Sequence, residues 1–597
     1  MEQLSYAEIQ EQLRSASLES LPRLGISVLR NATVEPIEPY LCYLAWRAGL
    51  RAEVRFGRYD NILQDATDPS SELWEGSADA VLVFARLEEL CPDLCYRFPA
   101  LDADDVRAEI ERVRGFAAAT LRALRGHSRA AVLWHGFETP AHPAFGIHDS
   151  QSDAGQLRAV RDLNDALRQT LRDDGDAYFV DLDLGLARVG AERFYDPRTW
   201  HIGRAPYSRE GLREIAEEDF KYVRALRGQA KKCLVLDCDN VLWGGVVGED
   251  GLEGIQLAPD YPGSPYYEFQ REARALYERG VILALCSKNN EDDVWQVFRE
   301  HPHMILSEEH IAAARVNWDD KATNLTRIAK DLNIGLDSLV FVDDSEFEVG
   351  LVRETLPEVE VIHLPKAHAV RARELLASCG WFDTLTLSEE DRQRGRMYKA
   401  EARRRELETT TDLATYLRSL EMRACIRLVD GATVPRVAQL TQRTNQFNLT
   451  TRRYSEADIV RLEDASDSDV LYVRLADRFG DYGIVGAAIL RHGVERPDRS
   501  EIDTLLLSCR VIGRGVEDAF LSACLELARQ RGAASVCGRY APTRKNRLVR
   551  DFYPERGFAM ESDEGEETIY AFDLSERIPL PPDHLEGATL DARESAA

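Results

Sequence analysis

Residues 233–239 read Cys-Leu-Val-Leu-Asp-Cys-Asp, a short apolar run that ends in two aspartates. Near-continuous apolar runs of this length are typical of strands that are buried on both faces of a parallel sheet. Side chains alternate along a strand, so the carboxylates of Asp237 and Asp239 point to the same side. Open α/β sheets bind ligands at the carboxyl ends of their strands. The stretch therefore predicts a parallel sheet with a ligand site at one edge.

Further apolar runs follow in the central region of the chain, which we place at residues 229–382. They cover residues 281–286, 304–306, 338–342 and 359–363. Polar residues stand at or beyond the ends of these runs, namely Ser287, Lys321, Asp343 and Asp344. Because the carboxyl ends of parallel strands meet at one edge of a sheet, we expect these side chains to converge on Asp237 and Asp239.

The acidic residues among them predict a magnesium site. Mg²⁺ takes hard oxygen ligands and often shares them with a substrate phosphate. The expected ligands are Asp237, Asp239 through its backbone carbonyl, Asp343 and Asp344.

The same residues predict phosphoryl transfer. Asp237 would attack phosphorus to give an aspartyl-phosphate, and Asp239 would pass protons to the leaving oxygen and from the entering one. Ser287 and Lys321 would hold the transferring phosphoryl group by a hydrogen bond and by charge. A single Asp-x-Asp pair is often a helix cap or a solvated turn, but several polar strand ends in this order make that alternative improbable.

The order of these motifs resembles that of the haloacid dehalogenase-like (HAD) superfamily. Residues 236–251 and 286–291 look specifically like the FkbH-like branch, the glyceryl transferases of polyketide biosynthesis. The long members of that family also carry a flavodoxin-like N-terminal domain and an acetyltransferase-like C-terminal domain, so the resemblance covers nearly the whole chain. Val241 and Ser345 stand where Thr and Asn are common in the family, and neither replaces a catalytic carboxylate.

This resemblance implies a substrate and a partner. D-1,3-bisphosphoglycerate would lose phosphate and leave its glyceryl group as a thioester on an acyl carrier protein, in a Mg²⁺-dependent reaction. The family mechanism places the glyceryl group on an enzyme cysteine first, and Cys238 and Cys286 are the candidates, with Cys238 preferred. Each could equally be a small buried hydrophobe. The alternatives are a plain HAD-type phosphatase of a small metabolite and a non-catalytic scaffold that docks the carrier.

The N-terminal region, residues 1–228, predicts a second parallel sheet. Its apolar runs, residues 25–29, 80–84, 130–134 and 177–180, are separated by helical stretches. The region resembles SGNH hydrolases, which have a flavodoxin-like fold. However, Asn31-Ala32-Thr33 occupies the place of the motif that contains the nucleophilic serine. Asp196 and His201 could be remnants of a catalytic triad. Without the nucleophile we expect docking or structural support rather than catalysis.

The C-terminal region, residues 421–575, combines strand-like runs with a helix at about residues 515–531. The loop Arg510-Val-Ile-Gly-Arg-Gly515 fits that of the GNAT acetyltransferases, and Asn546 matches the same fold. Such glycines let backbone N–H groups approach a pyrophosphate at a helix N-terminus. The resemblance implies that Arg510, Gly513 and Gly515 hold coenzyme A or the phosphopantetheine arm of the carrier. Residues 445–448 and 477–481 would line the cleft or form turns.

The fold class that we expect is α/β with three domains: a central HAD-type Rossmann-like parallel sheet, flanked by the flavodoxin-like or SGNH-like α/β domain and by a GNAT-like α+β domain. Residues 383–420 are highly charged and predict a helical connector. Residues 576–597 are rich in Pro, Asp and Glu and predict a disordered tail.

Composition limits the partners. The chain has 597 residues and a net charge of −28, which would repel nucleic acid. No apolar run is long enough to span a membrane, and eleven cysteines without CxxC pairs indicate a reducing cytoplasm. Carrier proteins are usually acidic, so we expect one to dock on a basic patch, formed by Arg510 and Arg514 or by Arg544, Lys545 and Arg547.

Overall fold

The structure is a computed structural model, and it describes residues 4–387, 391, 397, 413–478, 480–493, 496–543, 545–563, 565 and 567–590. The chain forms two compact units, Met1–Arg224 and Ala225–Ala597. The first contains one sheet and the second contains two. Most of the expected connector lies outside the described residues, apart from the helix α20 (Leu413–Ser419) near its end. The boundaries of the three expected domains stay a prediction.

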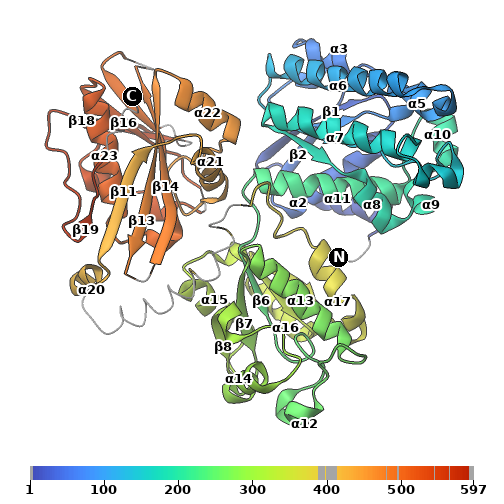
Figure 1. Cartoon of the computed structure of the whole chain (residues 1–597). Coiled ribbons are helices and arrows are strands. Elements are labelled where there is room, and N and C mark those ends of the chain that lie inside the picture. Colours follow the sequence, from blue (N-terminus) through green and yellow to red (C-terminus); the bar gives the residue numbers. More distant parts are fainter. Residues whose placement is uncertain are drawn as a thin grey trace. The chain divides into compact units, whose positions relative to one another are not determined.

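The first unit is a five-stranded parallel sheet with helices on both faces. Its strands are β1 (Arg23–Arg30), β2 (Arg51–Phe56), β3 (Ala80–Phe84), β4 (Ala131–His135) and β5 (Ala177–Val180), in the order β2-β1-β3-β4-β5. The helices α1 (Tyr6–Ser15), α2 (Glu38–Arg47) and α11 (Arg209–Leu226) cover one face. The helices α3 (Ile62–Thr67), α6 (Ala103–Arg125) and α7 (Gln156–Asp174) cover the other (Figure 1). Both faces bury apolar residues, as the sequence predicts for such strands.

A second five-stranded parallel sheet follows in the central part of the chain. Its strands are β6 (Cys233–Leu236), β7 (Ile282–Ser287), β8 (Ile311–Val316), β9 (Leu339–Asp343) and β10 (Glu360–His363), in the order β10-β9-β6-β7-β8. The helices α13 (Ser264–Glu278), α14 (Glu291–Glu300) and α17 (Ala372–Ser378) pack on one face. The helices α15 (Lys321–Asp331) and α16 (Glu346–Thr355) pack on the other. The short helix α12 (Val247–Gly254) follows β6.

One predicted strand of this sheet is wrong. Residues 304–306 form no strand, because the backbone N–H groups of Ile305 and Leu306 donate to the side chain of Gln270, at 3.0 and 3.2 Å. The fifth strand is β8 instead, whose sequence Ile-Ala-Ala-Ala-Arg-Val is less apolar. An edge strand has a neighbour on one side only, so its sequence carries a weaker signal than that of a central strand.

The C-terminal sheet is mixed. Its strands are β11 (Met422–Leu428), β12 (Phe447–Asn448), β13 (Ser468–Asp477), β14 (Gly480–His492), β15 (Arg499–Leu507), β16 (Ser535–Tyr540), β17 (Ala559–Asp563), β18 (Thr568–Asp573) and β19 (Leu585–Glu586). Their order is β17-β18-β16-β15-β14-β13-β11-β19, and β12 pairs with β15. The helix α23 (Val516–Gln530) packs on one face, and α21 (Val434–Arg443) and α22 (Glu456–Asp464) pack on the other. The whole chain is thus α/β with two parallel sheets and one mixed sheet.

The disordered tail that the composition predicts is wrong for residues 576–590. There the chain forms β19, which pairs in parallel with β11, and Leu585 and Ala588 are buried in the core beside α23. A few apolar residues that reach a sheet edge outweigh the polar composition of the segment. Residues 591–597 lie outside the described part.

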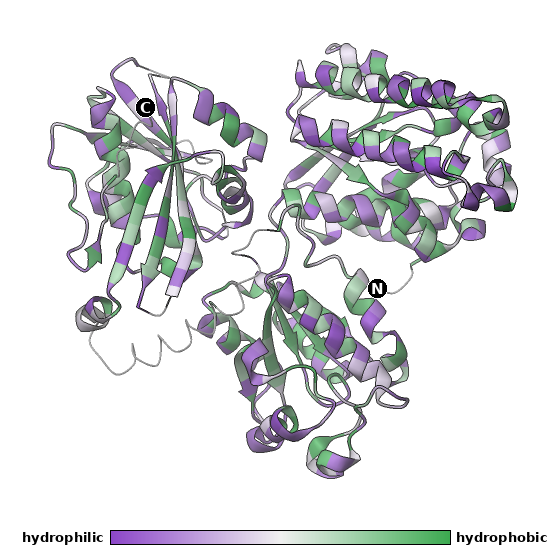
Figure 2. Ribbon diagram, in the orientation of Figure 1, coloured by the Kyte–Doolittle hydropathy of each residue, from purple (hydrophilic) through white to green (hydrophobic). Residues whose placement is uncertain are grey.

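Hydropathy follows this architecture. The central strands of the two parallel sheets are largely hydrophobic, whereas the outer faces of the helices are hydrophilic (Figure 2). No described helix is both long and apolar enough to cross a membrane.

Candidate active site

Three carboxylates meet at the carboxyl edge of the central sheet. Asp237 directly follows β6, and Asp343 and Asp344 stand at the end of the neighbouring strand β9. The backbone N–H of Asp237 donates to the carbonyl of Val342 at 3.0 Å, which fixes the register of the two strand ends. Each of the three residues offers a carboxylate oxygen within 4.8 Å of the other two. The structure therefore brings together the two acidic motifs, as we expected from the strand ends.

Lys321 lies beside these carboxylates at the first position of α15. Its Nζ atom lies 2.8 Å from Oδ1 of Asp237 and 3.1 Å from Oδ2 of Asp343, and it donates to the carbonyl of Cys286 at 2.6 Å. Burial alone would lower the pKa of this ammonium group, but Asp237 and Asp343 raise it above its usual value. Lys321 is therefore a fixed positive charge in the buried part of the site.

One lysine does not balance the negative charge of this cluster. Burial and the neighbouring Asp237 raise the pKa of Asp343, and the same two causes raise the pKa of Asp344. A divalent cation relieves such repulsion, and carboxylate oxygens are the ligands that Mg²⁺ prefers. The donor set of Asp237, Asp343 and Asp344 thus fits a magnesium ion.

The side chain of Asp239 does not belong to this donor set. Its Oδ1 accepts hydrogen bonds from Nε1 of Trp243 at 2.8 Å and from the N–H of Val247 at 3.1 Å, and its Oδ2 accepts one from Nδ2 of Asn289 at 2.9 Å. Burial raises the pKa of this carboxyl group, although the hydrogen bonds oppose the shift. The carboxyl group of Asp239 is therefore held by its own hydrogen-bond partners, apart from the other three aspartates. The magnesium ligand predicted from the sequence was the backbone carbonyl of Asp239, and that role stays a prediction.

Asn289 is a site residue to which the sequence analysis gave no role. Ser287 closes β7 and is buried, and Nδ2 of Asn289 lies 3.4 Å from its hydroxyl oxygen. The same amide nitrogen reaches Asp239, so Asn289 links the two residues. The sequence signal that could have identified Asn289 was its place two positions beyond Ser287, within the motif at residues 286–291.

The two candidate cysteines are both inside the core. Cys238 is 0% exposed, and burial followed by Asp237 raises the pKa of its thiol well above the usual range. Cys286 is also 0% exposed, and burial raises the pKa of its thiol to about 12. A reactive cysteine needs an accessible thiolate. The acyl-carrying role of Cys238 or Cys286 stays a prediction, and the structure gives it no support.

The glycine loop of the C-terminal sheet is closed by its own chain. Gly513 and Gly515 have φ of +78° and +81°, as the motif requires. However, the N–H of Gly513 donates to Oε1 of Glu517 at 3.1 Å. The carboxylate of Glu517, at the start of α23, therefore occupies the amide that would bind a phosphate oxygen. A Cβ atom on Gly515 would lie 2.6 Å from Cγ of Pro582. The loop therefore offers a pyrophosphate neither a vacant amide at Gly513 nor open space at Gly515.

The arginine of this motif is buried as well. Arg510 is buried, and its guanidinium donates to the hydroxyl of Ser508 at 3.3 Å and to the carbonyl of Tyr482 at 3.4 Å. The ring of His584 donates from Nε2 to the carbonyl of Arg514 at 2.9 Å, which ties the C-terminal segment to the loop. The binding of coenzyme A or phosphopantetheine by Arg510, Gly513 and Gly515 stays a prediction that this geometry does not favour.

Two of the residues 445–448 belong to the sheet. They form β12, in which Phe447 and Asn448 are buried and pair with β15. The next residue, Leu449, receives the N–H of Ala541 at 2.8 Å, and the side chain of Asn546 donates to the carbonyl of Asn448 at 2.9 Å. The chain itself thus fills the position beside β15 where an extended ligand would pair.

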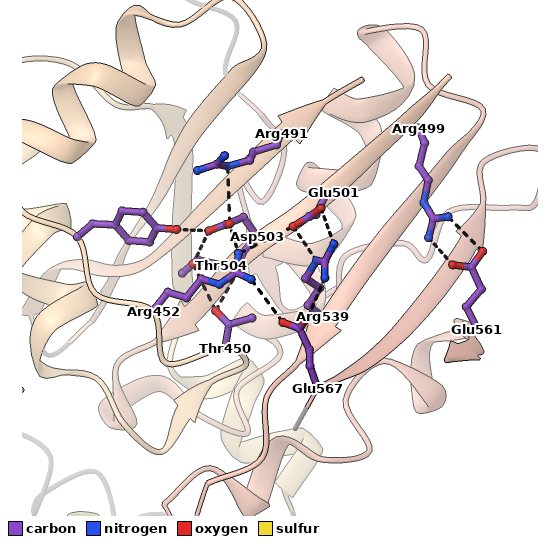
Figure 3. Close-up of polar contacts among 11 residues, drawn as sticks. Thr450, Arg452, Arg491, Arg499, Glu501, Asp503, Thr504, Arg539, Glu561 and Glu567 are labelled. Atoms are coloured by element: carbon purple, nitrogen blue, oxygen red, sulfur yellow. Dashed lines mark hydrogen bonds and ion pairs between the residues drawn. The ribbon is translucent and has the colours of Figure 1, made fainter. Parts of the chain in front are cut away.

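A network of ion pairs covers part of the C-terminal sheet (Figure 3). The buried carboxylate of Asp503 accepts hydrogen bonds from Arg452 and from the hydroxyls of Tyr454 and Thr504. Its neighbours Glu501 and Arg539 form a bidentate pair at 2.8 and 3.1 Å. Because opposite charges are matched throughout these contacts, the network has the features of a structural element rather than of a ligand site.

Polar side chains also gather at the carboxyl edge of the N-terminal sheet. The amide side chain of Asn31 exchanges two hydrogen bonds with the backbone of Arg86, at 2.6 and 3.1 Å. The guanidinium of Arg86 pairs with Oε1 of Glu138 at 2.6 Å, and the hydroxyl of Tyr207 donates to the same oxygen at 2.9 Å. The guanidinium of Arg86 also pairs with Glu88, so one arginine holds two carboxylates at this edge.

The suggested remnant of a catalytic triad is wrong. The carboxylate of Asp196 caps α10 (Pro197–Gly203) by accepting the N–H groups of Arg198 and Thr199. His201 is exposed on that helix. Capping residues and surface histidines explain both positions without a catalytic role.

Comparison with known proteins adds one informative likeness. The N-terminal part of the protein BF1531 from Bacteroides fragilis, which contains a phosphatase domain and was solved complexed with Mg, is 26% identical, with a TM-score of 0.58, and the match covers 64% of this chain and all of that one. A putative acetyltransferase of the GNAT family from Desulfovibrio desulfuricans is 16% identical, with a TM-score of 0.22 and coverage of 25% and 99%. The GNAT domain of S. lividans PAT is 18% identical, with a TM-score of 0.21 and coverage of 25% and 89%. These two TM-scores are too low to support an argument. No family model and no curated protein matches the chain.

Proposed function

We propose that the chain is a Mg²⁺-dependent phosphoryl-transfer enzyme that removes phosphate from a small phosphorylated metabolite. The observation that carries this proposal is the cluster of Asp237, Asp343 and Asp344 beside Lys321 at the carboxyl edge of the central sheet. The likeness to a protein with a phosphatase domain that was solved with Mg supports both the reaction and the metal.

The site residues divide the chemistry between them. Lys321 holds Oδ1 of Asp237, which leaves Oδ2 as the atom that attacks phosphorus. The bond from phosphorus to the leaving oxygen breaks, and Asp239, whose pKa burial raises, donates a proton to that oxygen. Asp239 then takes a proton from the water that hydrolyses the aspartyl-phosphate. Bound Mg²⁺ supplies charge neutralisation for the phosphoryl oxygens, and Ser287 and Lys321 help to hold them.

We further propose that the substrate is D-1,3-bisphosphoglycerate and that the glyceryl group passes to an acyl carrier protein. The resemblance to the FkbH-like family supports this choice. The two phosphates of the substrate need different reactions, because the 3-phosphate is a monoester that requires phosphoryl transfer and the 1-phosphate is an acyl phosphate already activated toward a thiol. Since Cys238 and Cys286 are buried, the carrier's thiolate attacks the acyl carbon directly and phosphate leaves.

The competing function is that of a plain phosphatase in which no acyl group is transferred. A non-catalytic scaffold is disfavoured, because a buried cluster of Lys321 with several carboxylates is costly to desolvate and a scaffold has no use for it.

The test is to incubate the protein with Mg²⁺, enzymatically generated 1,3-bisphosphoglycerate and a holo carrier protein, and then to weigh the intact proteins. The proposal predicts phosphate release and a glyceryl adduct on the carrier. Phosphate release without an adduct supports the plain phosphatase, and no turnover contradicts both enzymes. The double variant C238S/C286S should still load the carrier if the thiol attacks directly.

A further inference from the structure

The basic patch that we expected to dock a carrier protein at Arg510 and Arg514 is buried, so a partner cannot reach it in this fold. Arg544 lies outside the described residues, and docking of a carrier on Lys545 and Arg547 stays a prediction. A more specific set of contacts surrounds Asp344, at the carboxyl edge of the central sheet.

Asp343 and Asp344 are neighbours in the chain, and both belong to the same acidic cluster. Side chains alternate along a strand, so two successive residues of β9 would point to opposite faces of the sheet. β9 ends at Asp343, and Asp344 lies in the bend that follows it. Even so, each offers a carboxylate oxygen within 4.8 Å of the other and of Asp237. The conformation of this bend therefore decides whether Asp344 can reach a metal ion.

Two residues from other segments of the chain hold Asp344 in this position. Nε2 of His363, at the end of β10, donates to the backbone carbonyl of Asp344 at 3.1 Å. Burial and Asp237 raise the pKa of Asp344, and a hydrogen bond from the side-chain amide of Asn240 opposes this shift. A bond that favours the charged form of a carboxyl group also favours it as a metal ligand, because the ligand must be deprotonated. His363 thus fixes the backbone of Asp344, and Asn240 fixes its side chain.

Asn240 is itself held by the turn that follows β6. It has a φ of +56°, a left-handed conformation that asparagine and glycine adopt more readily than most residues. Its Oδ1 accepts the N–H of Gly245 at 3.1 Å. The next three residues of the chain, 241–243, are 0% exposed, so the turn is anchored in the core. With Oδ1 engaged by Gly245, the amide nitrogen is the atom that donates to Asp344.

The same turn carries the acid of the proposed reaction. Asp239 precedes Asn240, and its Oδ1 accepts hydrogen bonds from Nε1 of Trp243 at 2.8 Å and from the N–H of Val247 at 3.1 Å. One turn therefore holds both the carboxyl group that moves the proton and the amide that contacts Asp344. The amide of Asn240 does not ionise, so its contribution is one of position.

We propose that Asn240 and His363 are positioning residues that hold the carboxylate of Asp344 for the binding of Mg²⁺. The inference rests on the proposed function in one respect, which is that Asp344 ligates the Mg²⁺ used for phosphoryl transfer. Neither residue touches the reacting atoms. Loss of either contact weakens the binding of Mg²⁺ and leaves the chemical step of the loaded enzyme intact, because the contacts of Asp237 and Asp239 do not change.

The test is calorimetric titration of the full chain with Mg²⁺ alone. Asn240→Gly keeps the left-handed backbone and removes the amide, so we expect the Kd for Mg²⁺ to rise about tenfold. The matched control is Asn333→Gly, because Asn333 has a φ of +49° and lies beyond the end of α15 that is remote from Lys321. This control should bind Mg²⁺ as the wild type does, which accounts for the conformational entropy that a glycine adds.

A second pair of variants tests His363. His363→Ala loses the N–H that reaches the carbonyl of Asp344 and should also raise the Kd for Mg²⁺ about tenfold, whereas His363→Gln keeps a donor and should restore most of the affinity. Phosphate release at saturating Mg²⁺ should stay within about twofold of the wild type for both alanine and glycine variants. Should Asn240→Gly fail to fold, which its melting temperature shows, the two His363 variants decide the inference.

Metal binding and turnover are measured separately, so the inference and the proposed function can fail separately. If Asn240→Gly and His363→Ala weaken Mg²⁺ binding but no phosphorylated compound is turned over, the positioning role stands and the proposed reaction falls. If both variants bind Mg²⁺ as tightly as the wild type, or if Asn333→Gly weakens binding equally, the inference is overturned and phosphate release still tests the proposed function. A wild type that binds no Mg²⁺ overturns the inference too.

Discussion

The N-terminal and central sheets have the same architecture and different carboxyl edges. Both consist of five parallel strands with helices on both faces. At the N-terminal edge, Arg86 pairs with Glu138 and Tyr207 completes the contact. At the central edge, Lys321 faces Asp237 and Asp343, with Asp344 close by. A sheet edge thus positions polar groups in both cases, but the excess of carboxylates is larger at the central edge. There, three carboxylates surround one lysine, whereas Arg86 pairs with two, Glu88 and Glu138.

Charge balance therefore distinguishes a site from a structural contact. The surplus at the central edge is visible in the raised pKa values of Asp343 and Asp344, which burial and Asp237 cause. Raised values of this kind are common where a ligand completes the electrostatics.

The largest expected effect concerns Asp237, the proposed nucleophile. Asp237→Asn should lower phosphate release on the order of 10⁴-fold, because an amide cannot form the aspartyl-phosphate. The matched control is Glu138→Gln at the N-terminal edge, which should leave phosphate release within about twofold since it removes no reacting group. Measuring inorganic phosphate for both variants checks the difference. Comparable losses of phosphate release in both variants would contradict a catalytic site that is confined to the central sheet.

The next effect concerns the stability of the N-terminal unit. Arg86→Leu leaves the buried carboxylate of Glu138 without its guanidinium partner, which should cost about 3 kcal/mol of unfolding free energy. Phosphate release by the folded enzyme should not change. Urea unfolding followed by circular dichroism gives the first quantity and a phosphate assay the second. A loss of activity without a loss of stability would assign Arg86 to a reaction.

Bound Mg²⁺ should stabilise the folded protein, and this stabilisation should depend on the carboxylates of Asp343 and Asp344. At a Mg²⁺ concentration a hundredfold above Kd, binding adds about 2.7 kcal/mol to the stability of the folded state, so EDTA should lower the melting temperature of the wild type. In the double variant D343N/D344N, the temperature should be the same with Mg²⁺ and with EDTA. The variant D196N, which alters a helix cap in the N-terminal unit, should keep the magnesium response.

The smallest expected effect tests Asn289 as a positioning residue for Asp239. Asn289→Ala removes the hydrogen bond of 2.9 Å to Oδ2 of Asp239 and should lower kcat about tenfold with little change in KM. A merely structural role would lower the melting temperature and leave kcat of the folded enzyme intact. Asn289→Asp should not rescue kcat, because a carboxylate cannot donate that hydrogen bond.

The parts of the site that could be predicted from the sequence are those that follow from strand ends. Asp237, Asp343 and Asp344 each end an apolar run, and parallel strands bring such ends to one edge. The role of Asn289 depends on the turn that places Asp239 beside Trp243 and Val247, which no periodicity encodes.

The sequence was least informative where long-range contacts decide the outcome. The ligand-binding role of Gly513 and Gly515 stays a prediction, but Glu517 and a segment nearly seventy residues further on, at Pro582, close the loop. The segment around Leu585 was assigned to a tail because its contact with β11 lies outside any local window. The polar composition of a segment is a local property, whereas its burial depends on which distant residues it contacts.

The most direct test of phosphoryl transfer at the central edge is to locate a trapped phosphoryl group. The Asp239→Asn variant, which lacks the base for hydrolysis, is mixed with Mg²⁺ and acetyl phosphate as an activated donor, quenched in acid and digested for tandem mass spectrometry. The proposed mechanism predicts a phosphoryl group on Asp237 and none when Asp237→Asn is combined with it. A phosphoryl group on another residue, or equal labelling of both proteins, would contradict the mechanism.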